Sequence, residues 1–427
     1  MQNRVQKKKK ISLTTMIFIA LLAGALAGVI INYLIPSNYV VDDIIVQGIF
    51  YIVGQGFIRL MRMLVVPLVF CSIVCGSMAV GDTKKLGSVG VKTLIFYLCT
   101  TALAITVALS IANIFNPGKG LDMSQIQVTS TVSETTQSMS MTETLLDIIP
   151  VNIFNSLSEG NMLQIIVFAL ILGVILANMG DRVDIVKNFF GQFNDIMMEM
   201  TMAVMKLAPI GVFCLIAKTF AEIGFEVFIP LLKYMFCVLL ALAVQCFVVY
   251  LGLLKIFSGL NPFIFIKNFF PVMAFAFSTS TSNATIPMNI DTLAEKMGVS
   301  KKISSFTIPL GATINMDGTS IMQGVAVVFT AQAFGIPLDM MDYLTVIGTA
   351  TLASIGTAGV PSVGLITLTM VFNSVGLPIE GIALIMGIDR ILDMTRTAVN
   401  ITGDAVCTTI VASWNKAVDR DVYYKRK

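Results

Sequence analysis

Long apolar runs limit what this chain of 427 residues can fold into. Eight runs are candidate membrane helices, and they cover residues 12–34, 47–80, 88–116, 144–179, 194–221, 227–256, 303–332 and 378–414. An α-helix needs about 20 predominantly apolar residues to cross a bilayer. Only 12% of the residues are charged, whereas a soluble protein carries about 25%. The sequence therefore predicts an all-α membrane protein with eight transmembrane helices and lipid as its solvent.

The positions of Lys and Arg predict the orientation of these helices. Basic residues gather at 4–10, 84–92, 182–187, 296–302 and 416–427, whereas residues 331–342 contain none. Cytoplasmic loops of membrane proteins carry an excess of Lys and Arg. We therefore expect a multi-pass protein of the cell (inner or plasma) membrane with both termini in the cytoplasm. The first apolar run is longer than the core of a signal peptide, so it is expected to be a membrane helix.

Several function classes are disfavoured by what the sequence lacks. It contains no histidine, and its seven cysteines lie in apolar runs without metal-ligand spacing. No nucleophile–base pair or cofactor motif is present, so the chain is not expected to be an enzyme. The formal net charge of +3 is too small to suggest a nucleic-acid partner.

Two further segments are apolar but interrupted. In 262–290, the Ser/Thr-rich stretch 278–283 divides the apolar residues, and in 343–375 the stretch 354–361 does so. Neither half of either segment can cross about 30 Å of hydrocarbon as a helix rising about 1.5 Å per residue. Each segment is therefore expected to enter the membrane and turn back as a re-entrant helical hairpin. Such paired, broken segments point to the central site of a transporter; the alternative is two interfacial loops.

The run at 378–414 carries a polar stripe. At about 100° per residue, one face collects Asp389, Arg390, Asp393, Arg396, Thr397, Asn400 and Asp404. Charges at membrane depth are costly, so the stripe requires partners or a polar cavity. It could be a self-neutralising structural network, but three Asp and two Arg leave a net charge of −1 and room for a cation.

A second polar cluster, Asn315-Met316-Asp317-Gly318-Thr319, lies within the run 303–332. Its carboxylate, amide and hydroxyl oxygens suit a hard cation such as Na⁺, and dense acidic loops of the Ca²⁺ type are absent from the sequence. A buried aspartate hydrogen-bonded for packing is the alternative. Thr100 and Thr101 are polar residues in an apolar run and by themselves indicate little.

Four motifs together resemble the dicarboxylate/amino acid:cation symporter family, which includes the glutamate transporters. They are Asn-Met-Asp-Gly-Thr at 315–319, the Ser/Thr-rich tip at 278–283, Ser-Ile-Gly-Thr-Ala-Gly-Val-Pro at 354–361, and Asp-Met-x-Arg-Thr-x-Val-Asn-x-x-Gly-Asp at 393–404. The resemblance covers nearly the whole chain.

The resemblance implies a homotrimer with an elevator-type transport mechanism. Residues 1–86 (spans one and two) and 144–222 (spans four and five) would form the scaffold. Residues 87–118 (span three) and 223–418 (span six, first hairpin, span seven, second hairpin, span eight) would form the moving transport domain. Residues 119–143 would be a flexible external loop and 419–427 a cytoplasmic tail.

The resemblance also implies the residues that bind an acidic amino acid. Arg396 would pair with the side-chain carboxylate of the substrate, and Asp393 would take its amino group. The main carboxylate would be held by Asn400, Thr319, Ser282 and the backbone around Val360. Ser280, Gly364, Arg390 and Thr397 complete the expected substrate site.

Three Na⁺ sites follow from the same resemblance, with Na⁺ as the co-transported ion. The first comprises Asp404 with carbonyls near Gly311, Asn315 and Asn400. The second comprises Asp317 with Asn315, Thr100 and Thr101. The third uses backbone around Thr313, Ser354, Ile355 and Thr357, with Met316 nearby.

Three positions depart from the family pattern. Ser280 stands where some archaeal relatives have Arg, and Arg390 could supply that charge from the last helix. Gln323 stands where mammalian glutamate carriers have an acidic proton carrier, which argues against proton co-transport by that route. Ser362-Val363 replaces smaller residues after the proline of the second hairpin.

The main prediction is an inward Na⁺-coupled symporter of aspartate or glutamate. One alternative keeps the fold but carries C4-dicarboxylates or neutral amino acids, or couples to protons. A dicarboxylate has no ammonium group for Asp393, and a neutral substrate would leave the charge of Arg396 without a partner. A more distant alternative is an anion channel.

Overall fold

The computed structural model describes residues 13–81, 88–121, 149–224, 228–355 and 363–425. These residues are helical, apart from turns and one isolated β-bridge between Val299 and Val418. The first half comprises α1 Leu13–Leu34, η1 Val40–Phe50, α2 Tyr51–Gly81, α3 Ser88–Phe115, α5 Ile153–Glu159, α6 Met162–Met179, η3 Gly180–Val183, α7 Asp184–Met205 and α8 Ala208–Ile223. The second half comprises α9 Phe228–Ala243, η5 Val244–Tyr250, α10 Leu251–Ser258, α11 Pro262–Thr279, α12 Ser282–Met297, α13 Lys301–Ile314, α14 Asp317–Ala333, α15 Met340–Ser354, α16 Val363–Ser374, α17 Gly381–Trp414 and α18 Arg420–Tyr423.

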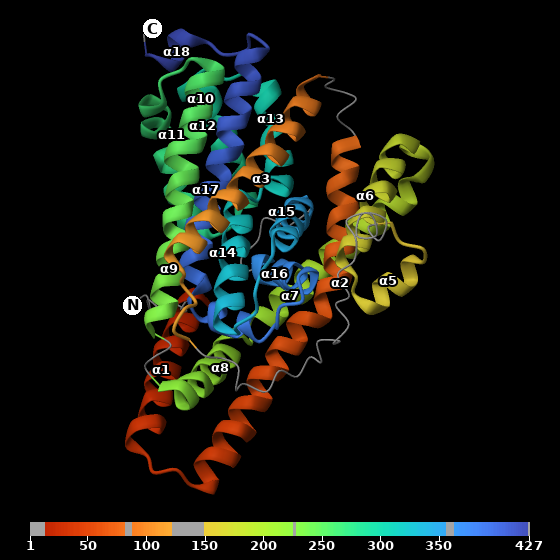
Figure 1. Ribbon diagram of the computed structural model, residues 1–427. Helices are drawn as coiled ribbons and strands as arrows, with labels where there is room; N and C mark the ends of the chain where they lie inside the picture. The colour runs from red at the N-terminus through yellow and green to blue at the C-terminus, as the bar shows by residue number, and fades with distance from the viewer. Residues whose placement is uncertain (1–12, 82–87, 122–148, 225–227, 356–362, 426–427) are drawn as a thin grey trace, which may run out of the picture.

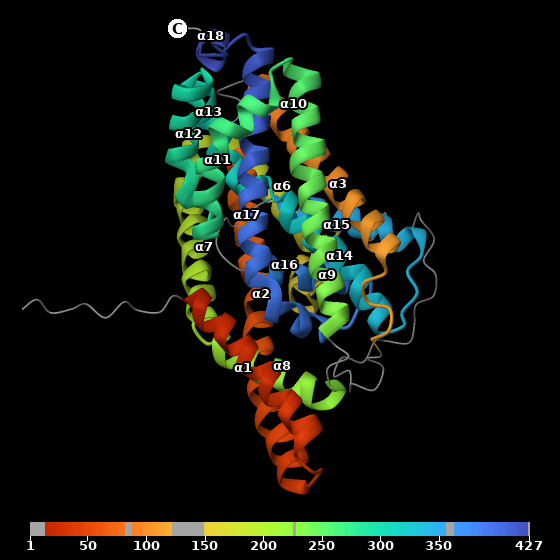
Figure 2. The same ribbon diagram turned by 90° about the vertical axis from the view of Figure 1, so that its left-hand side faces the viewer.

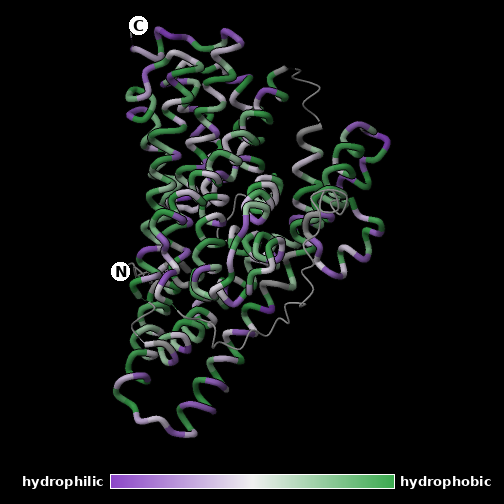
Figure 3. Tube along the Cα trace, viewed as in Figure 1, coloured by the Kyte–Doolittle hydropathy of each residue, from purple (hydrophilic) through white to green (hydrophobic). Residues whose placement is uncertain are grey.

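Six stretches of the described residues are long and apolar enough to cross a membrane. They are Thr15–Leu34, Val40–Leu60, Val89–Phe115, Gln164–Val204, Phe228–Ser258 and Pro262–Thr279. Figure 3 shows hydrophobic residues along most of the trace of these helices, and many large apolar side chains in them are exposed, such as Leu26, Ile95 and Phe247. The prediction of an all-helical, multi-pass membrane protein agrees with these helices.

The long helix α17 lies within the bundle that contains α9 to α14, on the left-hand side of Figure 1. It packs against α9, α11, α13 and α14. Every residue of α14 except Gln332 is buried, as expected for a helix enclosed on all sides. On the other side of the molecule, α1 packs on α8, and α2 packs on α6 and α7. The polar stripe of α17 therefore lies deep in the helical packing.

Both interrupted segments form helical hairpins. The first consists of α11 and α12, which pack together and break at Ser280 and Thr281. Ser280 adopts a left-handed conformation, with φ of 52°, which ends α11. The second hairpin consists of α15 and α16; the intervening residues 356–362 lie outside the described residues. Figure 2 shows the first hairpin near the C-terminal end of α17 and α16 near its opposite end.

Three expected spans are divided in the structure. The expected span 144–179 contains two helices, α5 Ile153–Glu159 and α6 Met162–Met179. The run 303–332 was expected as one span, but it is two helices that break at Asn315 and Met316, because Asn315 has an extended backbone and Asp317 begins α14. An aspartate in the first turn favours a helix N-terminus. The expected span 194–221 is also divided: α7 already begins at Asp184, and α8 begins at Ala208 with a proline in its first turn.

The C-terminal segment packs against the base of the first hairpin. Asp419 N donates to Gly298 O over 2.8 Å, and Ser300 N donates to Ala417 O over 3.0 Å. The buried Tyr423 donates its hydroxyl to Asn261 O over 2.8 Å. These bonds connect the end of α17 to both ends of the first hairpin.

Candidate functional site

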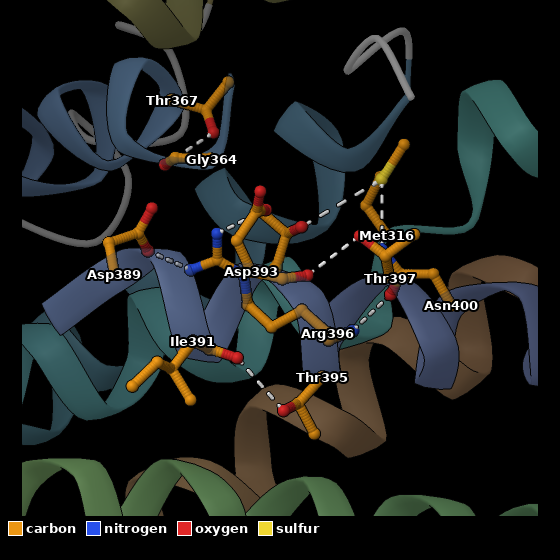
Figure 4. A network of polar contacts seen from close by, with 12 residues as sticks. Met316, Gly364, Thr367, Asp389, Ile391, Asp393, Thr395, Arg396, Thr397 and Asn400 are labelled. Carbon is orange, nitrogen blue, oxygen red and sulfur yellow. Dashed lines mark hydrogen bonds and ion pairs between the residues drawn. The ribbon is translucent and has the colours of Figure 1, made fainter. Parts of the chain in front are cut away.

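The centre of the site is an ion-pair network on α17 (Figure 4). Arg396 Nη1 lies 2.5 Å from Asp389 Oδ1, and Arg396 Nη2 lies 2.9 Å from Asp393 Oδ1. Arg396 is only 1% exposed. Burying charges costs several kcal/mol per ion unless they are paired and hydrogen-bonded. The two aspartates satisfy this requirement at both Nη groups, whereas Arg396 Nε has no hydrogen-bond partner among the described residues.

The second hairpin and α14 approach this network closely. A Cβ placed on Gly364 of α16 would lie 2.9 Å from Thr319 Cγ2 and 3.4 Å from Arg396 Nη2. Thr319 is buried, as is Thr397, whose hydroxyl donates to Asp393 O over 2.8 Å. A glycine at 364 thus lets the backbone of the hairpin approach the guanidinium group.

Asn400 joins α17 to the break between α13 and α14. Its Oδ1 accepts a hydrogen bond from Gly318 N at 2.7 Å, and its Nδ2 lies 3.3 Å from Met316 Sδ. Its backbone oxygen accepts from Asn315 Nδ2 at 3.1 Å. Because Asn400 is two turns or less from Arg396 and Asp393, this amide connects the ion-pair network to the helix break.

Asp404 and Asn315 form the first of two buried aspartate clusters. Asn315 Nδ2 donates to Asp404 Oδ1 over 2.8 Å. A Cβ on Gly311 would collide with the Asp404 carboxylate, so only glycine fits there. Asn315 Oδ1 is buried and has no hydrogen-bond partner among the described residues. An oxygen in that state is a candidate ligand for a cation, because leaving it unpaired costs about 1–3 kcal/mol.

Asp317 is the centre of the second cluster. It is fully buried, and neutral donors from two other helical segments surround it. Thr101 of α3 donates to Oδ1 over 2.5 Å. Gln245 Nε2 and the Tyr250 hydroxyl, both on η5, donate to Oδ2 over 3.0 and 2.7 Å. The described residues give this carboxylate hydrogen bonds but no basic side chain.

The remaining predicted residues lie at the hairpin tips and in α13. Ser280 and Ser282 are buried at the tip of the first hairpin, and Ser280 Oγ has no partner among the described residues. Ser354 and Ile355 are buried at the end of α15. Thr100 and Thr313 donate their hydroxyls to carbonyls of their own helices, Tyr97 O and Leu310 O.

Some predictions fall outside the described part of the chain. Val360 and Thr357 belong to residues 356–362, and for Arg390 only the helical backbone is described. Sequence reasoning also missed Gln245 and Tyr250. Their only sequence signal is polarity within an apolar run, which is weak evidence for a role.

This buried, charged site between broken helices indicates a membrane transporter. The family model described as "Sodium:dicarboxylate symporter family" matches residues 13–414, and the chain belongs to this family. The predicted family resemblance is thereby confirmed, and the family is one of transporters rather than enzymes.

Similar proteins carry names of two substrate types. A proton/sodium-glutamate symport protein of Bacillus caldotenax is 40% identical over 95% of this chain and 95% of the relative. A proton/glutamate-aspartate symporter of Escherichia coli (strain K12) is 36% identical over 97% and 95%. The C4-dicarboxylate transport protein 1 of Ralstonia nicotianae is 33% identical over 86% of each chain. The chain is thus related to symporters of glutamate and of dicarboxylates.

Proposed function

We propose that this protein is a symporter that couples inward Na⁺ movement to the uptake of aspartate or glutamate. The observation that carries the proposal is the buried Arg396, held between Asp389 and Asp393 and facing Gly364 of the second hairpin. A guanidinium can bind a carboxylate through two parallel hydrogen bonds, which gives strength and direction in a dry site.

The proposed substrate pose uses both signs of charge on α17. Arg396 binds the side-chain carboxylate, and Asp393 binds the ammonium group. Thr319, Asn400, Ser282 and backbone near Val360 hold the main carboxylate. Ser280, Gly364, Arg390 and Thr397 line the same site. A substrate with two carboxylates and one ammonium therefore fits this set better than a neutral amino acid does.

The proposed cation sites rest on Asp317 and Asp404. Both carboxylates are buried, and each has neutral hydrogen-bond donors. Na⁺ entering as cargo offsets the cost of such buried negative charge. The cation at Asp317 would also be bound by Thr100, Thr101 and Asn315. The cation at Asp404 would also be bound by carbonyls near Gly311, Asn315 and Asn400. A third site would use backbone around Thr313, Ser354, Ile355 and Thr357, close to Met316.

We propose Na⁺ rather than H⁺ as the coupling ion, because Gln323 stands where mammalian glutamate carriers have an acidic proton carrier. This side chain is an amide, which does not carry a proton, and its Nε2 donates to the Thr367 hydroxyl over 2.8 Å. Relatives named proton/sodium-glutamate symport proteins leave both ions open for the family.

Movement and assembly are proposed from the family resemblance. The scaffold and transport domain, with the residue ranges given above, would slide against each other in an elevator motion. Three copies would assemble as a trimer in the cell membrane, with eight membrane spans per copy and both termini in the cytoplasm.

Uptake into proteoliposomes tests the proposal. Labelled aspartate, glutamate, succinate and serine are offered with and without an inward Na⁺ gradient at constant pH. Aspartate or glutamate accumulation that requires the gradient is expected. The second candidate is C4-dicarboxylate transport, favoured by the name of a relative at 33% identity; succinate uptake exceeding that of both amino acids would establish it instead. Uptake driven by a pH gradient alone would overturn Na⁺ coupling.

A further inference from the structure

Gln245 and Tyr250 lie on η5, the π-helical turn Val244–Tyr250 that interrupts the helix formed by α9 and α10. We infer that these two residues are positioning residues for the cation at Asp317: they hold Oδ2, so that Oδ1 is presented to the ion. The inference rests on the proposed function, because it deepens the account of the Asp317 cation site.

The π-turn explains how two residues five apart reach one carboxylate oxygen. In an α-helix, positions i and i+5 are about 140° apart around the axis, since each residue turns about 100°. A π-helix bonds residue i to i+5, which brings these positions close to one face. Accordingly, Gln245 Nε2 and the Tyr250 hydroxyl both reach Asp317 Oδ2, at 3.0 and 2.7 Å.

The two oxygens of Asp317 have different partners. Oδ2 receives both bonds from η5, whereas Oδ1 receives its bond from Thr101 at 2.5 Å. The Thr101 hydroxyl has a second acceptor, Tyr97 O, at 2.8 Å. Since it has one proton, it can turn that proton to Tyr97 O and offer a lone pair to a cation beside Oδ1. Gln245 and Tyr250 can keep their hydrogen bonds to Oδ2 when the cation binds beside Oδ1.

The environment of Gln245 indicates that the function of its side chain is to donate hydrogen bonds through Nε2. The side chain is fully buried, and its Nε2 also lies 3.5 Å from Thr100 O. Its Oε1 has no hydrogen-bond partner among the described residues. An unpaired buried carbonyl is destabilising, and an aliphatic residue would avoid that cost. An amide kept in such a position is therefore better explained by its bonds to Asp317 and Thr100 than by packing.

Tyr250 also borders the other aspartate cluster. A Cβ on Gly403 would lie 2.5 Å from the Tyr250 hydroxyl and 2.6 Å from Asn315 Nδ2. Gly403 therefore allows Tyr250 and Asn315, which bonds Asp404, to occupy neighbouring space against α17. The Tyr250 hydroxyl thus lies between Asp317 on one side and Gly403 of α17 on the other, which fixes its direction.

The test compares Tyr250→Phe with Tyr234→Phe. Both tyrosines lie on the helical segment 228–258 and are fully buried, but the Tyr234 hydroxyl has no hydrogen-bond partner among the described residues. Na⁺ affinity is measured by calorimetric titration of the purified full-length protein without substrate. Aspartate affinity is then measured at saturating Na⁺. Loss of an outer partner of a metal ligand lowers metal affinity about 10–100-fold, so Tyr250→Phe should lose about tenfold or more in Na⁺ affinity.

The aspartate affinity of Tyr250→Phe at saturating Na⁺ should stay within about twofold of the unaltered protein, and Tyr234→Phe should change neither value. Gln245→Met, which removes the donors at similar volume, provides the same test if Tyr250→Phe does not fold. Unchanged or tighter Na⁺ binding in these variants overturns the inference, as does an equal loss of both affinities. Absence of Na⁺ binding in the unaltered protein overturns the proposed function instead.

Discussion

Arg396 and Asp389 are seven residues apart on α17, and their side chains meet at 2.5 Å in the buried centre of the protein. Seven residues make nearly two helical turns, so both side chains occupy one face. Asp393 lies between them and bonds the second Nη of the same guanidinium at 2.9 Å. In this arrangement, an incoming carboxylate would exchange with one aspartate, and the arginine would never be left without an anionic partner.

Replacement of Arg396 is expected to change which substrates the protein accepts. Arg396→Ala should abolish aspartate uptake and permit binding of neutral amino acids, because the site loses its cation but keeps Asp393 for an ammonium group. Arg396→Lys should recover uptake only in part, since a lysine cannot form the bidentate pair. Uptake of labelled aspartate and serine into proteoliposomes measures both effects. Unaltered aspartate affinity in Arg396→Ala would refute the assignment.

A methyl group at Gly364 should weaken substrate binding through contact alone. It would lie 2.9 Å from Thr319 and 3.4 Å from Arg396, so the hairpin or the guanidinium must shift. Gly348→Ala on α15 of the same hairpin is the matched control, because nothing lies within 4 Å of a Cβ there. We expect aspartate affinity to fall about tenfold or more in Gly364→Ala, since overpacking costs about 1–3 kcal/mol, and to remain within about twofold in the control. Equal affinities in the two variants would place the hairpin away from the substrate.

Removal of the charge at Asp404 tests the first cation cluster. Asp404→Asn keeps the shape of the side chain but removes an anionic ligand, so we expect weaker Na⁺ dependence with a smaller effect on thermal stability. The hydrogen bond from Asn315 to Asp404 Oδ1 can still form if the new amide presents its oxygen. Uptake and thermal unfolding in detergent are measured across a Na⁺ series. If the apparent Na⁺ affinity is that of the unaltered protein, Asp404 has a structural role.

The polar stripe of α17 could be predicted because it depends only on helical periodicity. Asp389, Asp393, Arg396, Asn400 and Asp404 share one face of any regular helix, and all five are buried in the structure. The cost of burying such charges then points to function. The hairpins were also predictable from their polar interruptions, although the expectation that each half is too short to cross the membrane is wrong for α11, because Pro262–Thr279 is long and apolar enough to do so.

Other features depend on tertiary contacts that a sequence does not display. The break at Asn315 and Met316 contains no glycine or proline, and the nearest glycine, Gly318, lies inside α14. The π-turn that carries Gln245 and Tyr250 lies in an apolar stretch, Val244–Tyr250, that reads as ordinary helix. The role of its polar residues is visible only from their hydrogen bonds to Asp317, which is 67 residues from Tyr250 in the sequence.

The contact of the C-terminal segment with the first hairpin should contribute to stability. Gly298 has φ of 65°, and a Cβ there would collide with the backbone oxygen of Asp419. Gly376 also has φ of 65° but no neighbour within 4 Å of a Cβ, so Gly376→Ala isolates the backbone strain of about 1–2 kcal/mol. Gly298→Ala should lower the unfolding temperature more than Gly376→Ala does. Equal decreases, measured by thermal unfolding in detergent, would show that the contact with Asp419 is readily displaced.

Na⁺ and substrate should each raise the affinity of the other. Asn400 supplies the physical connection: its side chain accepts from Gly318 N, next to Asp317, and its backbone oxygen accepts from Asn315, which bonds Asp404. A cation that fixes Asn315 and Asp317 therefore also fixes Asn400, which reduces the conformational entropy that the substrate must otherwise remove. Linkage requires the same factor in both directions, typically about 5–150-fold.

Calorimetric titration of aspartate at several Na⁺ concentrations and constant ionic strength measures this coupling. The aspartate affinity should rise with Na⁺, and the Na⁺ affinity measured at saturating aspartate should rise by the same factor. In Asn400→Ala, which removes the side-chain bond to Gly318, the factor should shrink because the two sites lose one of their two connections. An aspartate affinity that stays flat across the Na⁺ series would mean that Na⁺ is not the coupling ion, and proton coupling would then be the better explanation.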